Sequence, residues 1–137
     1  MQSTIIGAPV PQIEGPAKVT GRTRYAADVD LPGMLWGKIL RSPHPHARIL
    51  RIDASAARSV PGVKAVITGQ DAPGHLMGKV LRDMPVLCWD KVRYIGDRVA
   101  AVAAETPEAA EEALLLIQVD YELLPAVFDP MEAMKPD

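Results

Sequence analysis

A run of six residues at 99–104 contains only valine and alanine. Successive side chains of a strand point to opposite faces, so a run that is apolar at both alternations predicts a strand covered on both sides. The small alanine side chains would also let a helix approach closely. We therefore place the core strand region at 92–104, with residues 99–104 in the middle of a sheet.

The segment after this strand has the clearest helix signals in the chain. Thr106 is a suitable N-cap, Pro107 stands where a missing N–H costs nothing, and Glu108 favours the positive end of the helix dipole. One apolar face follows at i, i+3, i+4 and i+7, formed by Ala110, Ala113, Leu114 and Ile117. We expect the main helix at about 106–118. A strand at 118–123 then suggests a crossover unit in a mixed sheet.

The other segments predict shorter elements. The prolines at 43 and 45 cannot donate to a sheet ladder, which predicts a bend or strand edge at 42–46. Asp53 or Ser55 can cap a short helix at about 54–60, and glycines indicate a long surface loop at 69–84. Further strands are expected at 34–40, 47–52 and 63–68, and a last helical turn at 130–134. The fold class is therefore α+β.

The N-terminal part differs in composition from the rest. Residues 1–20 hold two glycines and three prolines, which predicts an extended arm with turns and without regular structure. Residues 21–30 are ambiguous. We expect one domain at 21–137.

Composition excludes several classes of protein. The 137 residues are 48% hydrophobic and 23% charged with a net charge of −2, typical of a soluble globular domain. Without a basic patch or a long apolar run, we expect no nucleic-acid and no membrane partner. The single cysteine, Cys88, cannot form an intramolecular disulfide, which fits a cytoplasmic location.

The histidines are the first candidates for chemistry. His44 and His46 would share one face of a strand and could begin a metal site, but such sites need three or four ligands. His75 and Cys88 are the only other candidates, and the prolines favour a bend that would separate the pair. We therefore prefer a structural role for both histidines and expect no metal.

Three further features favour structural roles. Cys88 lies between Leu87 and Trp89 without a second cysteine or a local activating charge, as expected of a buried cysteine. Residues 69–74 have the glycine spacing of a phosphate loop, but the Lys and Ser or Thr that should follow are missing. This segment is expected to be a turn. A hairpin-type bend is likewise the commoner explanation for Gly96-Asp97-Arg98.

Basic residues surround the histidines and leave two interpretations open. They can form a solvated strand face, or they can dock a partner, because arginine is enriched at interfaces. The candidate interface consists of Arg41, His44, His46 and Arg48.

Several motifs, in order, resemble one known family. They are Pro11-Gln-Ile-Glu-Gly-Pro-Ala-Lys-Val-Thr-Gly21, Leu31-Pro-Gly-Met-Leu35, Arg41-Ser-Pro-His-Pro-His-Ala-Arg-Ile49, Lys91-Val-Arg-Tyr-Ile-Gly-Asp-Arg98 and Val119-Asp-Tyr-Glu-Leu-Leu-Pro125. Together they resemble the N-terminal α/β hammerhead domain of the large subunit of the aldehyde oxidase and xanthine dehydrogenase family, the molybdenum hydroxylases.

The resemblance implies that the chemistry lies elsewhere in the enzyme. Family members use molybdopterin, with iron–sulfur clusters and often FAD, and their catalytic and pterin-binding residues come later in a much longer chain. No catalytic or cofactor-binding residue is therefore carried over to this sequence, and we expect these 137 residues alone to be inactive. The implied partners are the molybdenum-binding portion and the iron–sulfur and FAD subunits or domains. The alternative is a freestanding, non-catalytic module for partner binding or assembly.

Overall fold

The computed structural model describes residues 7–135, which divide into two units at Pro32 and Gly33. The first unit contains the helix α1 (Gly15–Val19) and a 3₁₀ turn at Ala26–Asp28, and neither element buries a residue. The expectation of no regular structure at 1–20 is therefore wrong at α1. Pro16 lies in the first turn, where proline starts a helix instead of breaking one. Residues 1–6 of the expected arm lie outside the described residues.

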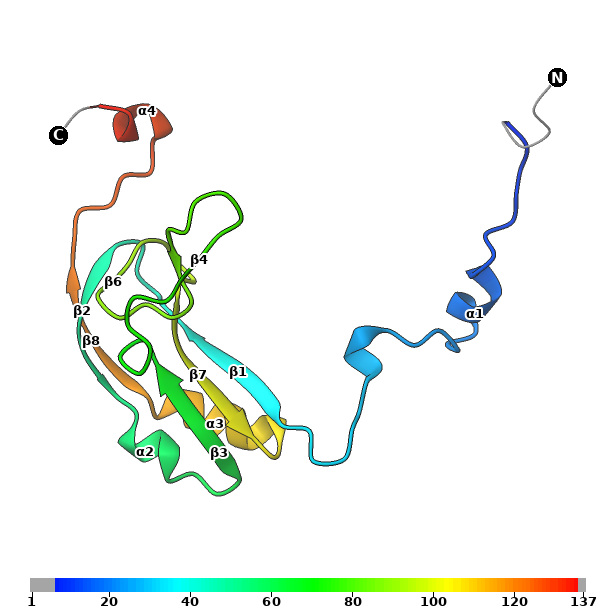
Figure 1. Ribbon diagram of the computed structural model, residues 1–137, viewed down its shortest axis with the longest axis horizontal. Coiled ribbons are helices and arrows are strands. Elements are labelled where there is room, and N and C mark those ends of the chain that lie inside the picture. Colours follow the sequence, from blue (N-terminus) through cyan, green and yellow to red (C-terminus); the bar gives the residue numbers. More distant parts are fainter. Residues whose placement is uncertain (1–6, 136–137) are drawn as a thin grey trace. The chain divides into compact units, whose positions relative to one another are not determined.

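The second unit is built around two three-stranded sheets (Figure 1). In the first sheet, β7 (Arg98–Ala104) lies between β1 (Trp36–Arg41) and β3 (Val63–Thr68). Val99, Ala100 and Ala104 on β7 are fully buried. The prediction of a central strand at 99–104 is confirmed.

The second sheet has β2 in its centre. Its strands are β6 (Lys91–Val92), β2 (Ala47–Asp53) and β8 (Gln118–Leu123), and a separate ribbon pairs β4 (Leu76–Met77) with β5 (Met84–Pro85). All of these strand pairs are antiparallel. The expected loop at 69–84 therefore contains strand β4 and the start of β5.

The helix α3 (Pro107–Leu115) covers the first sheet and contacts β1 and β7 (Figure 1). The Thr106 hydroxyl accepts a hydrogen bond from the Ala109 N–H at 3.1 Å, which confirms the predicted cap. Ala110, Ala113 and Ile117 are buried as the helical periodicity predicts. The core joins these residues and the buried residues of β7 to Ala47, Ile49 and Ile52 of β2 in one buried cluster.

The expected crossover from residues 99–104 to 118–123 is wrong, because β7 and β8 lie in different sheets. Both edges of β7 are already paired, with β1 and β3. β8 therefore has no free edge there and pairs with β2 instead. The α+β class itself is confirmed.

Two short helices complete the second unit. α2 (Ser55–Arg58) packs against α3 and β3. Ala54 occupies its N-cap position, and the Asp53 carboxylate accepts the N–H of Ser55 at 3.0 Å. The last element is α4 (Pro130–Ala133), and the side chain of its N-cap residue Asp129 accepts the Met131 N–H at 2.8 Å. Among residues 7–135, no helix is long and apolar enough to cross a membrane.

Candidate functional site

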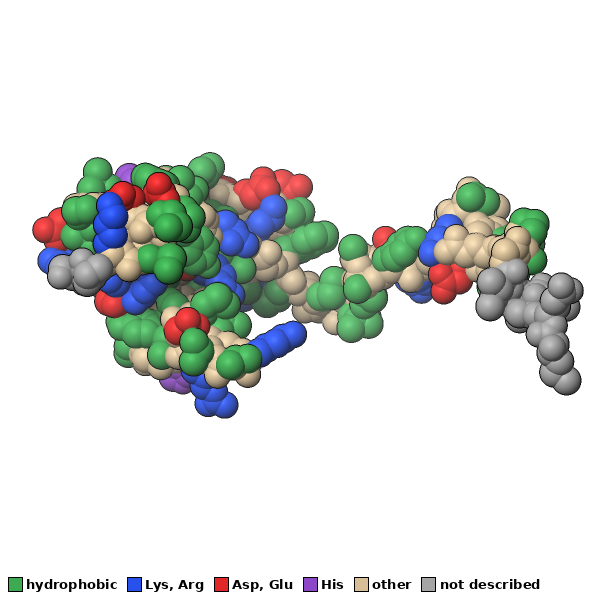
Figure 2. Space-filling model, turned by 90° about the horizontal axis from the view of Figure 1, so that it is seen from above, with side chains coloured by type: hydrophobic (Ala, Val, Ile, Leu, Met, Phe, Trp, Pro, Cys, Tyr) green, Lys and Arg blue, Asp and Glu red, His purple; other side chains and the backbone are tan. Residues whose placement is uncertain are grey.

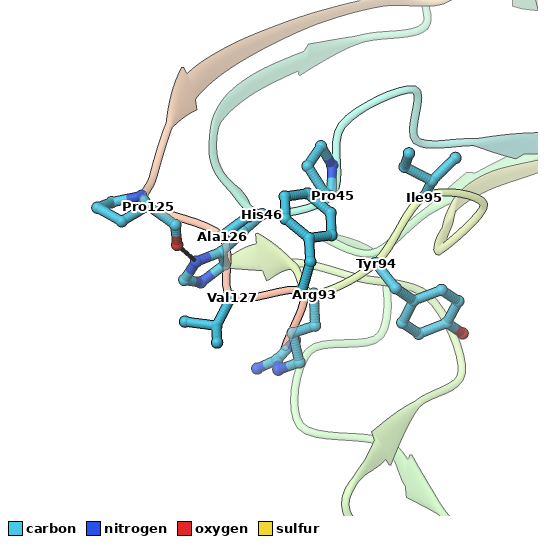
Figure 3. Close-up of a pocket in the computed structure, with 9 residues that line it drawn as sticks. Pro45, His46, Arg93, Tyr94, Ile95, Pro125, Ala126 and Val127 are labelled. Carbon is cyan, nitrogen blue, oxygen red and sulfur yellow. Dashed lines mark hydrogen bonds between the residues drawn. The ribbon is translucent and has the colours of Figure 1, made fainter. Parts of the chain in front are cut away.

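A pocket of about 530 Å³ opens at one end of the second sheet. Three segments line it: the bend before β2, the turn between β6 and β7, and the chain after β8 (Figure 3). Its lining is mostly apolar, with one imidazole and one guanidinium, and consists of Pro45, His46, Arg93, Tyr94, Ile95, Pro125, Ala126, Val127 and Phe128. A volume of this size falls in the range of small-molecule sites.

The first wall of the pocket is the bend at 43–46, which confirms the effect predicted for the prolines. His46 Nδ1 lies 2.6 Å from the Pro125 carbonyl oxygen and donates to it (Figure 3). This bond joins the bend to the segment after β8. His46 therefore positions two walls of the pocket.

The second wall is the turn before β7. Gly96 has φ of +92°, a conformation that favours glycine. The neighbouring Asp97 is 1% exposed, and its carboxylate accepts the backbone N–H groups of Arg93 at 3.1 Å and Arg98 at 3.0 Å. The predicted bend is confirmed. Burial and the Asp97 carboxylate together raise the pKa of Tyr94 in this turn.

The four candidate interface residues have different partners within the domain. Arg41 ends β1 and donates to the Gly96 carbonyl oxygen at 2.9 Å, whereas Arg48 on β2 pairs with Glu122 at 2.8 Å. His44 packs edge-on against the Tyr121 ring at a centroid distance of 4.9 Å. Only His46 lines the pocket, so the interface proposed for the set stays a prediction.

The two histidines have different partners, because His44 packs against Tyr121 and His46 bonds the Pro125 carbonyl oxygen. Within residues 7–135, no group of three or more His, Cys, Asp or Glu side chains is placed to hold a metal ion. The residues do not fit an iron–sulfur cluster either, because such clusters need several cysteine thiolates and this chain has one cysteine.

Cys88 is fully buried. Burial raises the pKa of its thiol to about 12, and the nearby Asp97 carboxylate adds to the rise. The thiolate needed for a nucleophile or a metal ligand is therefore suppressed. The structural interpretation of Cys88 agrees with this environment.

The glycine-containing segment after β3 is a turn, as predicted. Its Asp71 carboxylate accepts the Thr68 N–H at 2.6 Å, and a side chain at Gly69 would overlap the Cys88 carbonyl oxygen. A carboxylate directed into the loop backbone would repel phosphate. The segment therefore does not fit a phosphate group of a pterin or a nucleotide.

Sequence reasoning misses most of the pocket. The sequence pattern places Tyr94 and Ile95 in the strand region 92–104, which is wrong for 93–97, because this segment is the turn between β6 and β7. Residues 126–128 belong to no predicted element. Ile95, Val127 and Phe128 are 65%, 62% and 80% exposed. An apolar Ala-Val-Phe run outside any strand, between two prolines, is the signal that could have identified this surface.

Known proteins match most of this chain in sequence. The model for the aldehyde oxidase and xanthine dehydrogenase a/b hammerhead domain matches residues 20–125. A probable xanthine dehydrogenase subunit of Bacillus subtilis (strain 168) is 50% identical over 90% of this chain, but the match spans 17% of that protein. The "Nicotinate dehydrogenase large molybdopterin subunit" of Eubacterium barkeri is 40% identical over 97% of this chain and 32% of its own length.

Solved structures agree with these sequence matches. The crystal structure of the Cu,Mo-CO dehydrogenase in its carbon monoxide reduced state matches with a TM-score of 0.88 and 41% identity, over 96% of this chain and 17% of the other. Quinoline 2-oxidoreductase from Pseudomonas putida 86 matches with a TM-score of 0.82 and 39% identity, over 92% and 17%. The chain therefore belongs to the aldehyde oxidase and xanthine dehydrogenase family, as an a/b hammerhead domain.

Proposed function

We propose that this chain is the hammerhead part of a molybdenum-dependent oxidoreductase and packs beside its molybdopterin-binding portion. The observation that carries the proposal is the match of nearly the whole chain to 17% of the Cu,Mo-CO dehydrogenase chain. The role is structural, in the cytoplasm, and the cofactors belong to the rest of the enzyme. Iron–sulfur and FAD subunits or domains are the further partners.

The surface at the pocket supports a packing role. Tyr94, Ile95, Val127 and Phe128 expose apolar side chains around one hollow. Exposed apolar clusters of this kind mark protein contacts, because burying them removes apolar surface from water. On the face of the second unit in Figure 2, hydrophobic and charged side chains are interspersed, without a broad field of one sign.

Within the four-residue interface proposal, His46 is the best placed. Its ring lines the pocket, whereas Arg41, His44 and Arg48 do not. The two arginines bind acceptors elsewhere in the domain. We propose that the two arginines shape the docking surface mainly through these internal bonds. His46 is the residue of the set that meets the partner.

The test is affinity capture from the source cells with the tagged chain, followed by assay of molybdenum and iron in the bound material. We expect both metals to co-elute with the chain. The Ile95→Asp/Phe128→Asp variant should lose them, whereas Leu115→Asp, at a residue 86% exposed on α3, should retain them. A chain that elutes without molybdenum would contradict the proposal and favour the freestanding module.

A further inference from the structure

The outer edges of β3 and β8 differ in how far side chains cover their backbone groups. On β3, the Arg58 guanidinium reaches the Val66 carbonyl oxygen at 3.5 Å, and Asp71 accepts the Thr68 N–H at 2.6 Å. Side chains therefore occupy backbone groups that an added strand would need. Among the described residues, β8 has no comparable side-chain cover on its outer edge.

The register shows which backbone groups of β8 are free. The Leu124 N–H donates to the His46 carbonyl oxygen at 3.0 Å, and the same register continues along the strands to Tyr121. Hydrogen-bonded and non-hydrogen-bonded pairs alternate in an antiparallel ladder. The N–H and C=O groups of Tyr121 and Leu123 consequently point away from β2, toward an edge that no element of residues 7–135 pairs with.

The exposed face of β8 carries two carboxylates. Glu122 binds Arg48 on the neighbouring strand at 2.8 Å. Asp120 stands opposite Arg51 in the register, but Arg51 binds Asp53 at 2.7 Å instead. Within the described part of the chain, Asp120 has no ion-pair partner. A negative charge is therefore available beside the open edge.

We propose that the outer edge of β8 binds one extended segment of a partner protein that carries Lys or Arg at alternate positions. Main-chain hydrogen bonds to Tyr121 and Leu123 supply the attachment, as in other cases of strand addition. The basic side chains of the segment lie opposite Asp120 and Glu122, where opposite charges stabilise a cross-strand pair. This site is separate from the apolar pocket.

A second copy of the chain does not satisfy this edge. If two β8 strands pair antiparallel about Tyr121, Asp120 faces Glu122 of the other copy. If they pair about Asp120, the two Asp120 carboxylates face each other. Like charges directly opposite are destabilising, so the acidic residues select against self-pairing while they favour a basic partner.

The test uses the full 137-residue chain and two synthetic peptides, acetyl-(Lys-Val)₄-amide and acetyl-(Glu-Val)₄-amide. Amide hydrogen exchange is measured by nuclear magnetic resonance. We expect the lysine peptide to slow exchange at Tyr121 and Leu123 at least about threefold at saturation, and the glutamate peptide to have no effect. The Asp120→Lys/Glu122→Lys variant should bind the lysine peptide at least about tenfold more weakly.

A backbone variant separates strand addition from simple charge attraction. Leu123→Pro removes one outward N–H and should weaken binding, whereas Leu123→Ala should retain it; circular dichroism verifies that both variants fold. Unchanged exchange at Tyr121 and Leu123, or equal binding of both peptides, would overturn the proposal. A dimer in sedimentation that Leu123→Pro abolishes would also overturn it, because a second copy would then be the occupant.

Discussion

The Asp97 carboxylate, which is 1% exposed, accepts the backbone N–H of Arg93 at 3.1 Å and so closes the turn that forms one wall of the pocket. The same carboxylate accepts the Arg98 N–H at 3.0 Å. The Asp97 carbonyl oxygen accepts the Ser42 N–H at 2.8 Å, which connects this turn to the end of β1. One buried residue thus joins the two segments on either side of the pocket.

Replacing Asp97 should destabilise the fold. Asp97→Ala leaves two N–H groups without their acceptor, and buried unsatisfied donors cost about 1–3 kcal/mol. We expect the free energy of unfolding, measured by urea denaturation, to fall by about 1–3 kcal/mol in total, because both N–H groups are only partly buried. Asp120→Ala, at an exposed carboxylate, is the control and should change it by less than about 0.5 kcal/mol. Equal destabilisation by Asp97→Ala and Asp120→Ala would contradict this role of the Asp97 carboxylate.

Two glycines provide a matched test of packing. A methyl group at Gly69 would overlap the Cys88 carbonyl oxygen, whereas one at Gly37 meets nothing within 4 Å. Gly69→Ala should therefore lower the free energy of unfolding by about 1–3 kcal/mol. Gly37→Ala should leave it unchanged or raise it slightly. Thermal unfolding of both variants measures the difference, and a tolerated Gly69→Ala would disprove the close approach.

The Asp71 cap predicts a pH dependence of stability. Hydrogen bonds from the Thr68 backbone N–H and hydroxyl hold the pKa of Asp71 below its ordinary value of 3.8. A group with a lowered folded pKa stabilises the fold above its unfolded pKa, and this contribution is lost as the pH falls through the folded value. The unfolding free energy should therefore fall more between about pH 5 and pH 3 in the wild type than in Asp71→Asn. Parallel profiles would contradict this prediction.

Cys88 should be unreactive in the folded protein. With the pKa of its thiol raised to about 12, the thiolate fraction at about pH 8 is on the order of 10⁻⁴. Reaction with an aromatic disulfide reagent should therefore follow unfolding, and its rate should rise steeply with urea. The chain in denaturing urea is the control for full labelling. Rapid labelling without denaturant would show that the thiol is accessible.

Local patterns in the sequence determined the elements whose stability depends on near neighbours. Thr106 and Pro107 start α3 because a cap and a proline act within one turn. The valine and alanine run determined the buried strand β7, and the prolines at 43 and 45 determined the bend. Family motifs in order were also visible from the sequence, because they depend on residue identity and order alone.

Tertiary structure decided which strands pair and which side chains meet. β8 pairs with β2 because both edges of β7 are already paired. No local pattern in residues 118–123 shows which strand β8 pairs with. The bond from His46 to the Pro125 carbonyl oxygen joins residues 79 positions apart. The pocket and the open edge of β8 depend on such distant contacts. Local sequence determines backbone preference and burial period, but the free energy of pairing distant segments depends on the whole arrangement of the chain.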